Sequence, residues 1–495
     1  MGVPAMSIPH RTLKGARGLD TLSISGTAAL VGDLLIALGG ATYLAWSLSG
    51  ALETHWGSAL SKVLLTANGC IALFGIMYTI RKQQPLFAGF FCFNWMFLAV
   101  APLQQIGVGY WDPVFRRDAL VLEAVEICLL FNLMGLAFAL TRKYRTAALA
   151  ETPGYLDRSL LESRSAVLLL LVTATITIGL MAFYGSAMFT NREEFSTLIQ
   201  GSTTTKSTAI LVRSFLNPLA FVGSLVGLVI SYRRRSPIWM LFAFVLIGAA
   251  LVNNPIVQPR YRSSTLLMFA LLVAFGVRRI RLIVWFILFG VAASPIYNSL
   301  FRYNTYSADI RKFGTFFVHM DFDALDIFCY TILWVHNKGL EWGGNLLGAA
   351  LFFIPRTVWK GKSLHLAAII YDYLRDQGGF TIDNLSSPPP AEGYLSFGVA
   401  GAIGMSFVTV YAIDWVERRG LSAELYSAWH LILCLSPMLM IILLRGPLQV
   451  GFSEWVIHSL TVATVAVVLG AGGRRRVRVG ASAAPQAMLG SHVVH

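Results

Sequence analysis

The stretch Phe353-Ile-Pro-Arg-Thr-Val-Trp-Lys-Gly-Lys362 is basic and aromatic, whereas most of the chain is a succession of hydrophobic segments. It lies at the centre of the region Arg302–Gly401, in which charged residues, His and Trp are concentrated. Later in the same region, Ala391-Glu-Gly-Tyr-Leu-Ser-Phe-Gly398 leads into the next hydrophobic segment. The contrast between this polar region and its surroundings indicates how the chain is organised.

The composition is that of a membrane protein. Of the 495 residues, 56% are hydrophobic and only 13% are charged, whereas soluble proteins carry about 25% charged residues. Repeated runs of about 20 apolar residues predict transmembrane helices, because backbone polar groups in lipid must be satisfied within the segment. We predict an all-α polytopic membrane protein with about 12 spans, at 27–48, 58–80, 86–108, 119–141, 165–186, 208–231, 237–253, 264–277, 282–300, 396–415, 425–444 and 452–472.

The basic residues predict the orientation. Net charge is +14, and Lys and Arg cluster in every second connection between the predicted spans, which marks those connections as cytoplasmic. We assign most of the excess charge to this rule and not to nucleic-acid binding. Both termini are then cytoplasmic. The predicted parts are an N-terminal tail (1–26), nine spans (27–300), a large loop on the side opposite the cytoplasm (301–395), three spans (396–472) and a basic tail (473–495).

The large loop contains segments that predict helices at the membrane surface. Phe316–Trp334 and Leu364–Tyr373 have amphipathic patterns. Leu346–Ile354 is apolar but too short to span, and Pro355 is expected to end it. The loop then closes with an extended segment that ends in three prolines at Pro390.

Cationic residues of this loop are suited to a pyrophosphate. Arg356 offers a forked pair of donors, and Lys360 and Lys362 add point charges that would stabilise a departing diphosphate. Trp359 lies between them in the sequence and would contact substrate. The alternative is that these residues only anchor the loop at the membrane interface.

Other arginines are expected on the same side of the membrane. Arg260 and Arg262 precede the eighth predicted span, and Arg192 lies in an earlier connection on the same side. Arg213 lies inside the sixth span, where a cation is costly unless it is paired or faces a wet cavity. We predict that these four bind substrate, with anchoring at the interface as the alternative.

Transfer of a group from a pyrophosphate to an acceptor hydroxyl would need a base within hydrogen-bond reach of that hydroxyl. The candidates on the side opposite the cytoplasm are His319, Asp321, Asp323, Asp383 and Glu392, of which Asp383 is also expected to contact substrate. Glu392 has a structural alternative, since an acid before a helix stabilises its N-terminus. The Asp-x-Asp pair predicts no metal site, because residues two apart do not share a helix face. No metal and no cofactor are expected.

Three acids lie within the predicted spans: Asp33, Glu123 and Glu126. Acids in the membrane suggest proton or cation coupling, which is the feature that most favours a transporter. The alternative is that they pair with other helices. The chain shows no internal repeat of the kind found in two-halved transporters.

Residues 355–401 resemble the O-antigen polymerase family of bacterial oligosaccharide repeat-unit polymerases. Its members show Pro-Arg-x-x-Trp-x-x-Lys in a large periplasmic loop, followed by Glu-x-Tyr-x-x-Phe-Gly-x-x-Gly entering the next span. Here these motifs are Pro355–Lys362 and Glu392–Gly401. Ser363 stands where the family often has Pro. The segment Arg262-Ser-Ser264 also looks like the family.

The resemblance implies a GT-C-like lipid-linked glycosyltransferase in the bacterial inner membrane. Its substrate would be an undecaprenyl-pyrophosphate-linked oligosaccharide, and a chain-length regulator would be a partner. Arg356, Glu392, His319 and Tyr394 would be catalytic. An O-antigen ligase and a lipid-linked sugar flippase or transporter remain alternatives.

Overall fold

The computed structural model describes residues 26–109, 117–141, 163–190, 211–292, 317–318, 320–376 and 385–470. Every regular element in these ranges is helical. Nine of the described helical segments are long and apolar enough to cross a membrane, so the chain is a polytopic α-helical membrane protein. They correspond to the first six and the last three predicted spans, and are Ala28–Leu52, Ala59–Lys82, Pro85–Val108, Asp118–Thr141, Arg164–Phe189, Val212–Arg233, Pro389–Leu421, Ala428–Arg445 and Leu448–Gly470.

Within the described residues, the seventh, eighth and ninth predicted spans are shorter helices, and residues 293–300 of the ninth lie outside the described part of the chain. The three helices are α11 (Trp239–Val252), α12 (Arg260–Phe275) and α13 (Ile280–Ala292). At 1.5 Å per residue, the 16 residues of α12 extend about 24 Å, less than the hydrocarbon core of about 30 Å. The count of 12 spans therefore stays a prediction.

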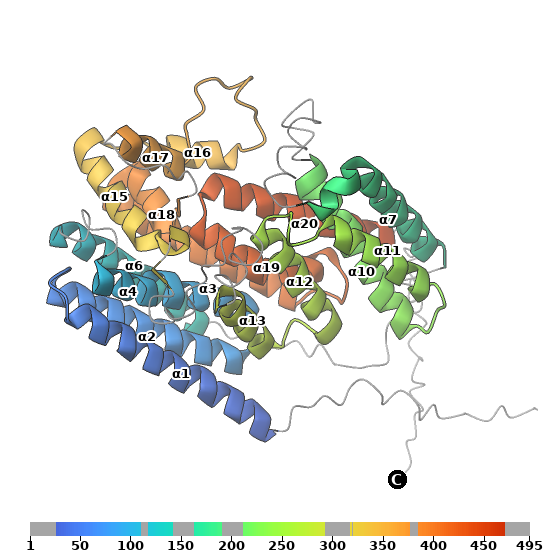
Figure 1. Cartoon of the computed structure of the whole chain (residues 1–495), viewed down its shortest axis with the longest axis horizontal. Helices are drawn as coiled ribbons and strands as arrows, with labels where there is room; N and C mark the ends of the chain where they lie inside the picture. Colours follow the sequence, from blue (N-terminus) through green and yellow to red (C-terminus); the bar gives the residue numbers. More distant parts are fainter. Residues whose placement is uncertain are drawn as a thin grey trace, which may run out of the picture. The chain divides into compact units, whose positions relative to one another are not determined.

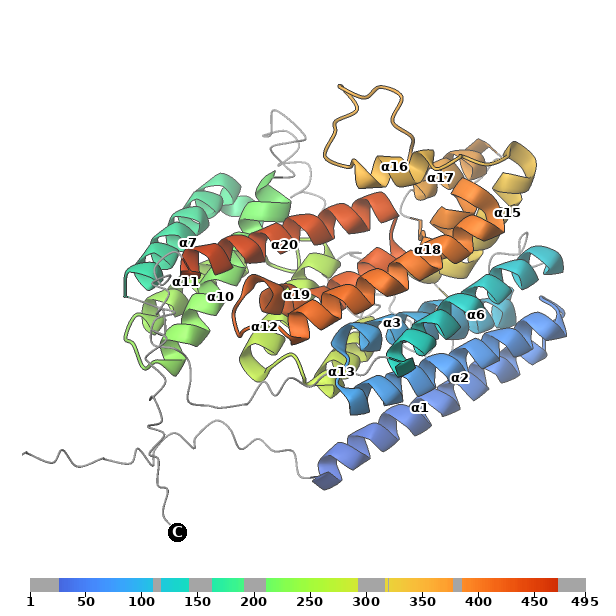
Figure 2. The same cartoon turned by 180° about the vertical axis from the view of Figure 1, so that it is seen from behind.

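The chain forms two compact units, with boundaries inside three of the C-terminal helices, at Glu417, Ser436 and Ser453. Figures 1 and 2 show the helices with their labels. The first unit contains α1 (Gly26–Leu52), α2 (Ala59–Lys82), α3 (Pro85–Trp95), η1 (Met96–Val100), α4 (Ala101–Val108), α6 (Asp118–Thr141), α13, η6 (Met320–Phe322), α15 (Ala324–Lys338), α16 (Gly344–Ala350), α17 (Leu366–Asp376) and most of α18 (Pro389–Leu421). It also holds the adjoining ends of α19 (Ala428–Arg445) and α20 (Leu448–Gly470).

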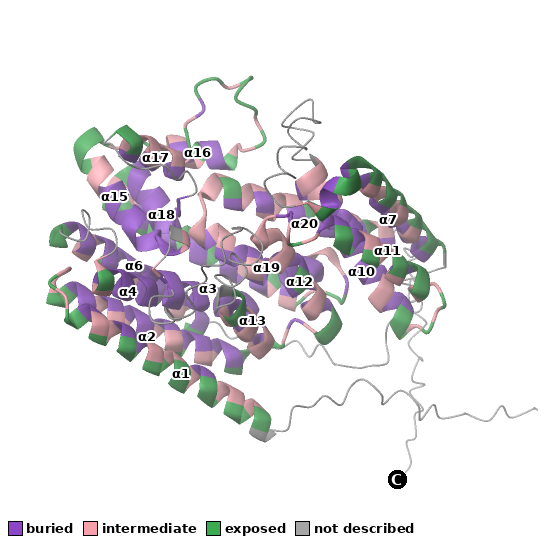
Figure 3. Ribbon diagram, viewed as in Figure 1, coloured by how far each residue is buried: buried purple, intermediate pink, exposed green. Residues whose placement is uncertain are grey.

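The core of the first unit is the continuous helix formed by α3, η1 and α4, whose spanning segment is buried along its length. In contrast, α1 exposes much of its apolar surface (Figure 3), as expected of a helix that faces lipid. Buried amides join the core to its neighbours: Asn68 Nδ2 donates to Leu98 O at 2.8 Å, and Asn132 Nδ2 donates to Asn68 Oδ1 at 2.8 Å. The N-terminus of α3 is satisfied by Glu417, whose carboxylate accepts from the Leu86 N–H at 2.6 Å.

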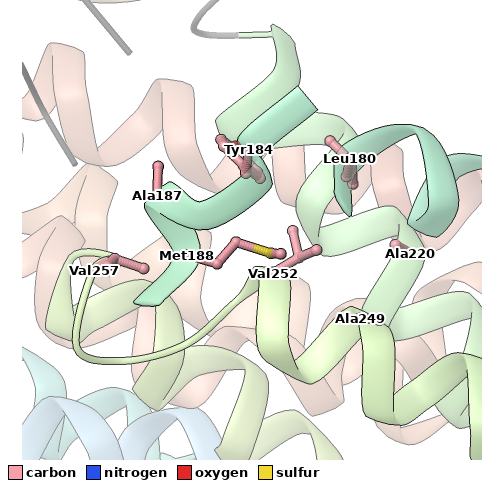
Figure 4. Packing of buried hydrophobic residues seen from close by; sticks show 8 residues of the cluster. All are labelled: Leu180, Tyr184, Ala187, Met188, Ala220, Ala249, Val252 and Val257. Atoms are coloured by element: carbon pink, nitrogen blue, oxygen red, sulfur yellow. The ribbon is translucent and has the colours of Figure 1, made fainter. Parts of the chain in front are cut away.

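The second unit is built around α7 (Ser163–Tyr184), η3 (Gly185–Phe189), η4 (Leu211–Leu216), α10 (Asn217–Arg233), α11 and α12. Its buried cluster draws side chains from α7, η3, α10 and α11 (Figure 4). The helices approach closely where Gly227 of α10 faces the ring of Phe242 of α11 and leaves no room for a Cβ.

The predicted loop helices form, with shifted bounds. α17 matches the segment predicted at 364–373, whereas α15 begins eight residues after the predicted Phe316, and α16 ends at Ala350, before Pro355. The structure differs most at α18, which begins at Pro389 and not at 396. Proline suits the first helical turn because it has no N–H to satisfy there, so Pro389 and Pro390 start a helix and do not extend the loop. Non-helical torsions at Phe397 and Gly398 then break α18, close to the predicted start of the span.

Two of the three acids predicted inside spans have protein partners. Asp33 of α1 accepts from Arg281 Nε at 2.6 Å and Nη2 at 2.8 Å. Glu123 of α6 accepts from the Tyr394 hydroxyl at 2.6 Å, and Glu126 is exposed. Helix pairing therefore explains Asp33 and Glu123 without ion coupling.

The Asp33–Arg281 pair gives a stability prediction. Asp33→Asn and Arg281→Gln should each lower stability by about 1 kcal/mol, discounted because Arg281 is partly exposed. The double variant should lose less stability than the two single variants lose together, since each single change removes the same contact. Thermal unfolding of the purified proteins tests this, and strict additivity would contradict it.

Candidate functional site

The second unit gathers charged and polar side chains around Arg262 in the first turn of α12. Arg262 Nη2 donates to Glu454 Oε1 at 2.6 Å and to Ser214 Oγ at 2.8 Å. The Tyr261 hydroxyl donates to the same Glu454 oxygen at 2.9 Å. Only 12% of the Arg262 side chain is exposed. The guanidinium is therefore held in one orientation by groups from three helical elements.

Arg213 belongs to the same cluster, although it lies in a different helix from Arg262. It sits in the π-helix η4, and its guanidinium is within electrostatic range of Arg262, Tyr184 and Tyr261. Two of the four predicted substrate-binding arginines are thus brought together. Arg260 is half-buried at the first residue of α12. Arg192 lies outside the described residues.

Glu454 and His458 were not predicted. Both lie in α20, one turn apart, and His458 is fully buried with Nδ1 3.4 Å from Glu454 Oε2. Their signal was present in the sequence, because an acid and a histidine at i and i+4 inside a hydrophobic span are expensive and mark a functional or paired site. The structure adds the partner, Arg262.

In the first unit, Glu392 joins three helices. Its Oε1 accepts from Ser387 Oγ at 2.8 Å and from the Leu448 N–H at 3.0 Å, and its Oε2 accepts from Asn345 Nδ2 at 2.8 Å. Ser396 Oγ donates to Asn345 Oδ1 at 2.6 Å. The carboxylate is 1% exposed with both oxygens engaged, so the geometry favours the structural alternative for Glu392 over the role of base.

Tyr394 is also buried. Its hydroxyl donates to Glu123, and its ring meets the edge of Phe328 at a centroid distance of 5.9 Å. These contacts join α18 to α6 and α15. That Tyr394 takes part in catalysis stays a prediction, because these contacts show only how the residue packs.

The predicted pyrophosphate-binding turn is held together by hydrogen bonds within the turn. Arg356 Nη1 donates to Lys362 O at 2.6 Å and Nη2 donates to Ser363 O at 3.0 Å. Lys362 is buried, and its ammonium donates to the carbonyls of Leu351, Phe352 and Ile354 at 2.9–3.2 Å. Those three bonds use all the donors of an ammonium group. Lys362 thus holds the turn together, and its contact with substrate stays a prediction.

The other members of this turn remain open to solvent. The Arg356 and Lys360 side chains are exposed, and Trp359 is half-buried with its ring 6.0 Å from the Lys362 ammonium. Arg356 uses two of its five donors within the turn. It therefore keeps donors for an anion.

Three aspartates lie before and at the start of α15. Asp321 pairs with Arg445, whose Nε donates to Asp321 O at 2.8 Å. Asp323 and Asp326 are fully buried, and neither oxygen of Asp326 has a hydrogen-bond partner within the described part of the chain. Burial raises the pKa of Asp323 to about 6 against the opposing charge of Arg445, and burial beside Asp323 raises the pKa of Asp326 well above its usual range. Asp326 is therefore protonated near neutral pH, whereas Asp323 loses its proton as the pH rises through about 6.

This pair predicts a pH dependence of stability. The pKa of Asp323 is about 6 in the folded state and 3.8 in the unfolded chain. The folded state therefore holds the Asp323 proton more tightly. The free energy of unfolding should therefore be highest below pH 3.8 and decrease as the pH rises through about 6. The decrease due to Asp323 is roughly 3 kcal/mol, at about 1.36 kcal/mol per pKa unit. Asp323→Asn should remove the part of this decline that is due to Asp323 and leave the part due to Asp326, as measured by thermal unfolding between pH 4 and 7. Asp372→Asn, at an exposed position, is the control, and an unchanged decline in Asp323→Asn would contradict the prediction.

No family model, curated protein or solved structure matches this chain. The likeness to the O-antigen polymerases thus stays a prediction from the two motifs. Of the residues it implies, His319 lies outside the described residues, as does the predicted Asp383.

Among the described residues, no three His, Cys, Asp or Glu side chains gather as metal ligands would. The second unit offers two arginines with hydroxyl groups beside them, a donor set that suits phosphate oxygens. Because the Arg262 guanidinium is already oriented, little reorganisation would be needed when negative charge develops next to it.

Proposed function

We propose that the chain is a membrane glycosyltransferase that polymerises undecaprenyl-pyrophosphate-linked oligosaccharide repeat units on the periplasmic face of a bacterial inner membrane. The growing glycan would pass from its lipid carrier to a hydroxyl of the next lipid-linked unit. The bond between the anomeric carbon and the diphosphate oxygen breaks and the lipid diphosphate leaves with the electron pair of that bond. A new glycosidic bond forms to the acceptor oxygen, whose proton is released to water.

The observation that carries the proposal is the Arg262 cluster. Arg262 and Arg213 come from different helices, lie within electrostatic range of each other, and are accompanied by Tyr261 and Ser214. Two cations brought together in a membrane protein are costly unless an anion compensates them. Glu454 supplies one negative charge to Arg262, and a diphosphate would supply more.

Arg356 supports the same chemistry from the first unit. It is exposed, lies in the motif that resembles the family, and retains unused donors. We assign it to a lipid-linked diphosphate as well. Arg356→Ala should abolish long chains while single repeat units still accumulate. Arg375→Ala, at an exposed arginine of α17, is the matched control.

Incubation of the purified protein with lipid-linked repeat units tests the proposal, with products separated by length. A ladder of polymers supports it. Glycan transfer only onto lipid A-core would instead identify a ligase, and movement of the lipid across vesicles without new glycosidic bonds would identify a flippase. A normal ladder from a well-expressed Arg356→Ala protein would remove Arg356 from the mechanism.

A further inference from the structure

The segment between α16 and α17 is a projecting loop with a fixed conformation. Figures 1 and 2 both show it extending away from α15–α18. The hydrogen bonds of Arg356 and Lys362 to five backbone carbonyls hold its two ends together. At its base, Phe352 packs edge-on against Phe452, with ring centroids 5.9 Å apart. The side chains at its tip are therefore presented by a rigid frame.

Two apolar side chains of this loop are exposed. Phe353 is 66% exposed and Val358 is 77% exposed, and the Lys360 side chain lies two residues beyond Val358. Exposure of a phenyl ring and a branched aliphatic group to water is unfavourable, and the hydrogen-bonded turn does not bury them. Burial of these groups in a second apolar phase would be favourable.

We propose that this loop is a membrane-binding site for anionic phospholipid. Phe353 and Val358 enter the acyl boundary of the leaflet, and Lys360 meets the lipid phosphate groups. This inference does not depend on the proposed enzymatic function.

The charge of the loop favours lipid over a protein partner. From Leu351 to His365 the chain has one arginine, two lysines and no acidic residue. Aromatic and aliphatic side chains next to uncompensated basic residues match the layered chemistry of a leaflet with anionic headgroups. Trp359 stands between Val358 and Lys360, as interfacial tryptophans do. The loop would then hold Arg356 at the depth of lipid phosphates.

Nitroxide labels on the full-length protein in nanodiscs test the site. In a Cys70→Ser background the other four cysteines are buried. Phe353→Cys and Val358→Cys carry the label at the two test positions. Leu34→Cys, on the exposed face of α1, is the lipid reference, and Glu424→Cys, at an exposed position, is the aqueous reference. Collisions with oxygen and with a water-soluble nickel chelate are compared. We expect labels 353 and 358 to behave like label 34, with oxygen collisions exceeding nickel collisions several-fold.

Lipid composition tests the role of charge. Label 358 should lie deeper in nanodiscs of phosphatidylglycerol than in nanodiscs of phosphatidylcholine. Lys360→Gln should remove most of that difference in depth. Lys338→Gln, at an exposed position of α15, is the control and should leave the difference unchanged. Labels as open to nickel as label 424 would overturn the proposal, as would labels shielded from both reagents, which would indicate a covering protein. An unchanged lipid preference in Lys360→Gln would overturn the part assigned to Lys360. No glycan is present, so failure of the enzymatic proposal cannot affect the result.

Discussion

A protein that carries Arg262→Met and Glu454→Gln together is expected to fold and to lose polymerisation by about 100-fold or more, the loss typical when one preorganised donor is removed from a transition-state oxyanion. Methionine has about the length of arginine without its charge, and glutamine can still accept from Tyr261 and Ser214. The double change therefore removes the cation and its counter-charge at once.

The double variant is needed because Arg262→Met alone leaves Glu454 buried without its cation. Loss of one partner of a buried ion pair costs about 3–5 kcal/mol, so inactivity of the single variant would not separate catalysis from folding. If Arg262 only holds the helices together, the double variant should regain activity along with its thermal stability. Arg235→Ala, an exposed arginine of the same unit, controls for loss of positive charge.

Glu392→Ala is expected to destabilise the protein by roughly 3 kcal/mol or more, whereas Glu392→Gln should retain most of the stability and of the activity. Alanine leaves Ser387 Oγ and the Leu448 N–H without their acceptor in a buried site and leaves Asn345 Nδ2 only the backbone oxygen of residue 392. Each unsatisfied group costs about 1–3 kcal/mol. Glutamine keeps one acceptor oxygen and the shape of the side chain.

Activity of the two variants separates the roles considered for Glu392. A general base cannot be replaced by an amide, so a base would lose its activity in Glu392→Gln at unchanged stability. The measurements are thermal unfolding and the rate of ladder formation at saturating substrate. A stable but inactive Glu392→Gln protein would contradict the structural role and restore Glu392 as the base.

Positions of the long spans could be predicted from sequence because they depend on local composition. A run of about 20 apolar residues leaves a helix as the only way to satisfy the backbone in lipid, and nine such segments form where they were expected. The three short helices show the limit of this argument, since apolar composition at α11 or α13 cannot say whether a helix spans. The start of α18 was missed because consecutive prolines suit both an extended segment and a first helical turn.

The residue types of the candidate site were determined by the sequence, but their partners were decided by the tertiary structure. Arginine was recognisable at 262 and 213 as a costly cation near a membrane, yet its proximity to Glu454 depends on which helices pack together. Lys362 and Glu392 were equally good candidates from their residue types. In the structure Lys362 contacts backbone carbonyls and Glu392 accepts from amide groups. A side chain's charge is a property of its residue, whereas the donors and acceptors it meets are set by contacts between residues far apart in the chain, which residue spacing does not encode.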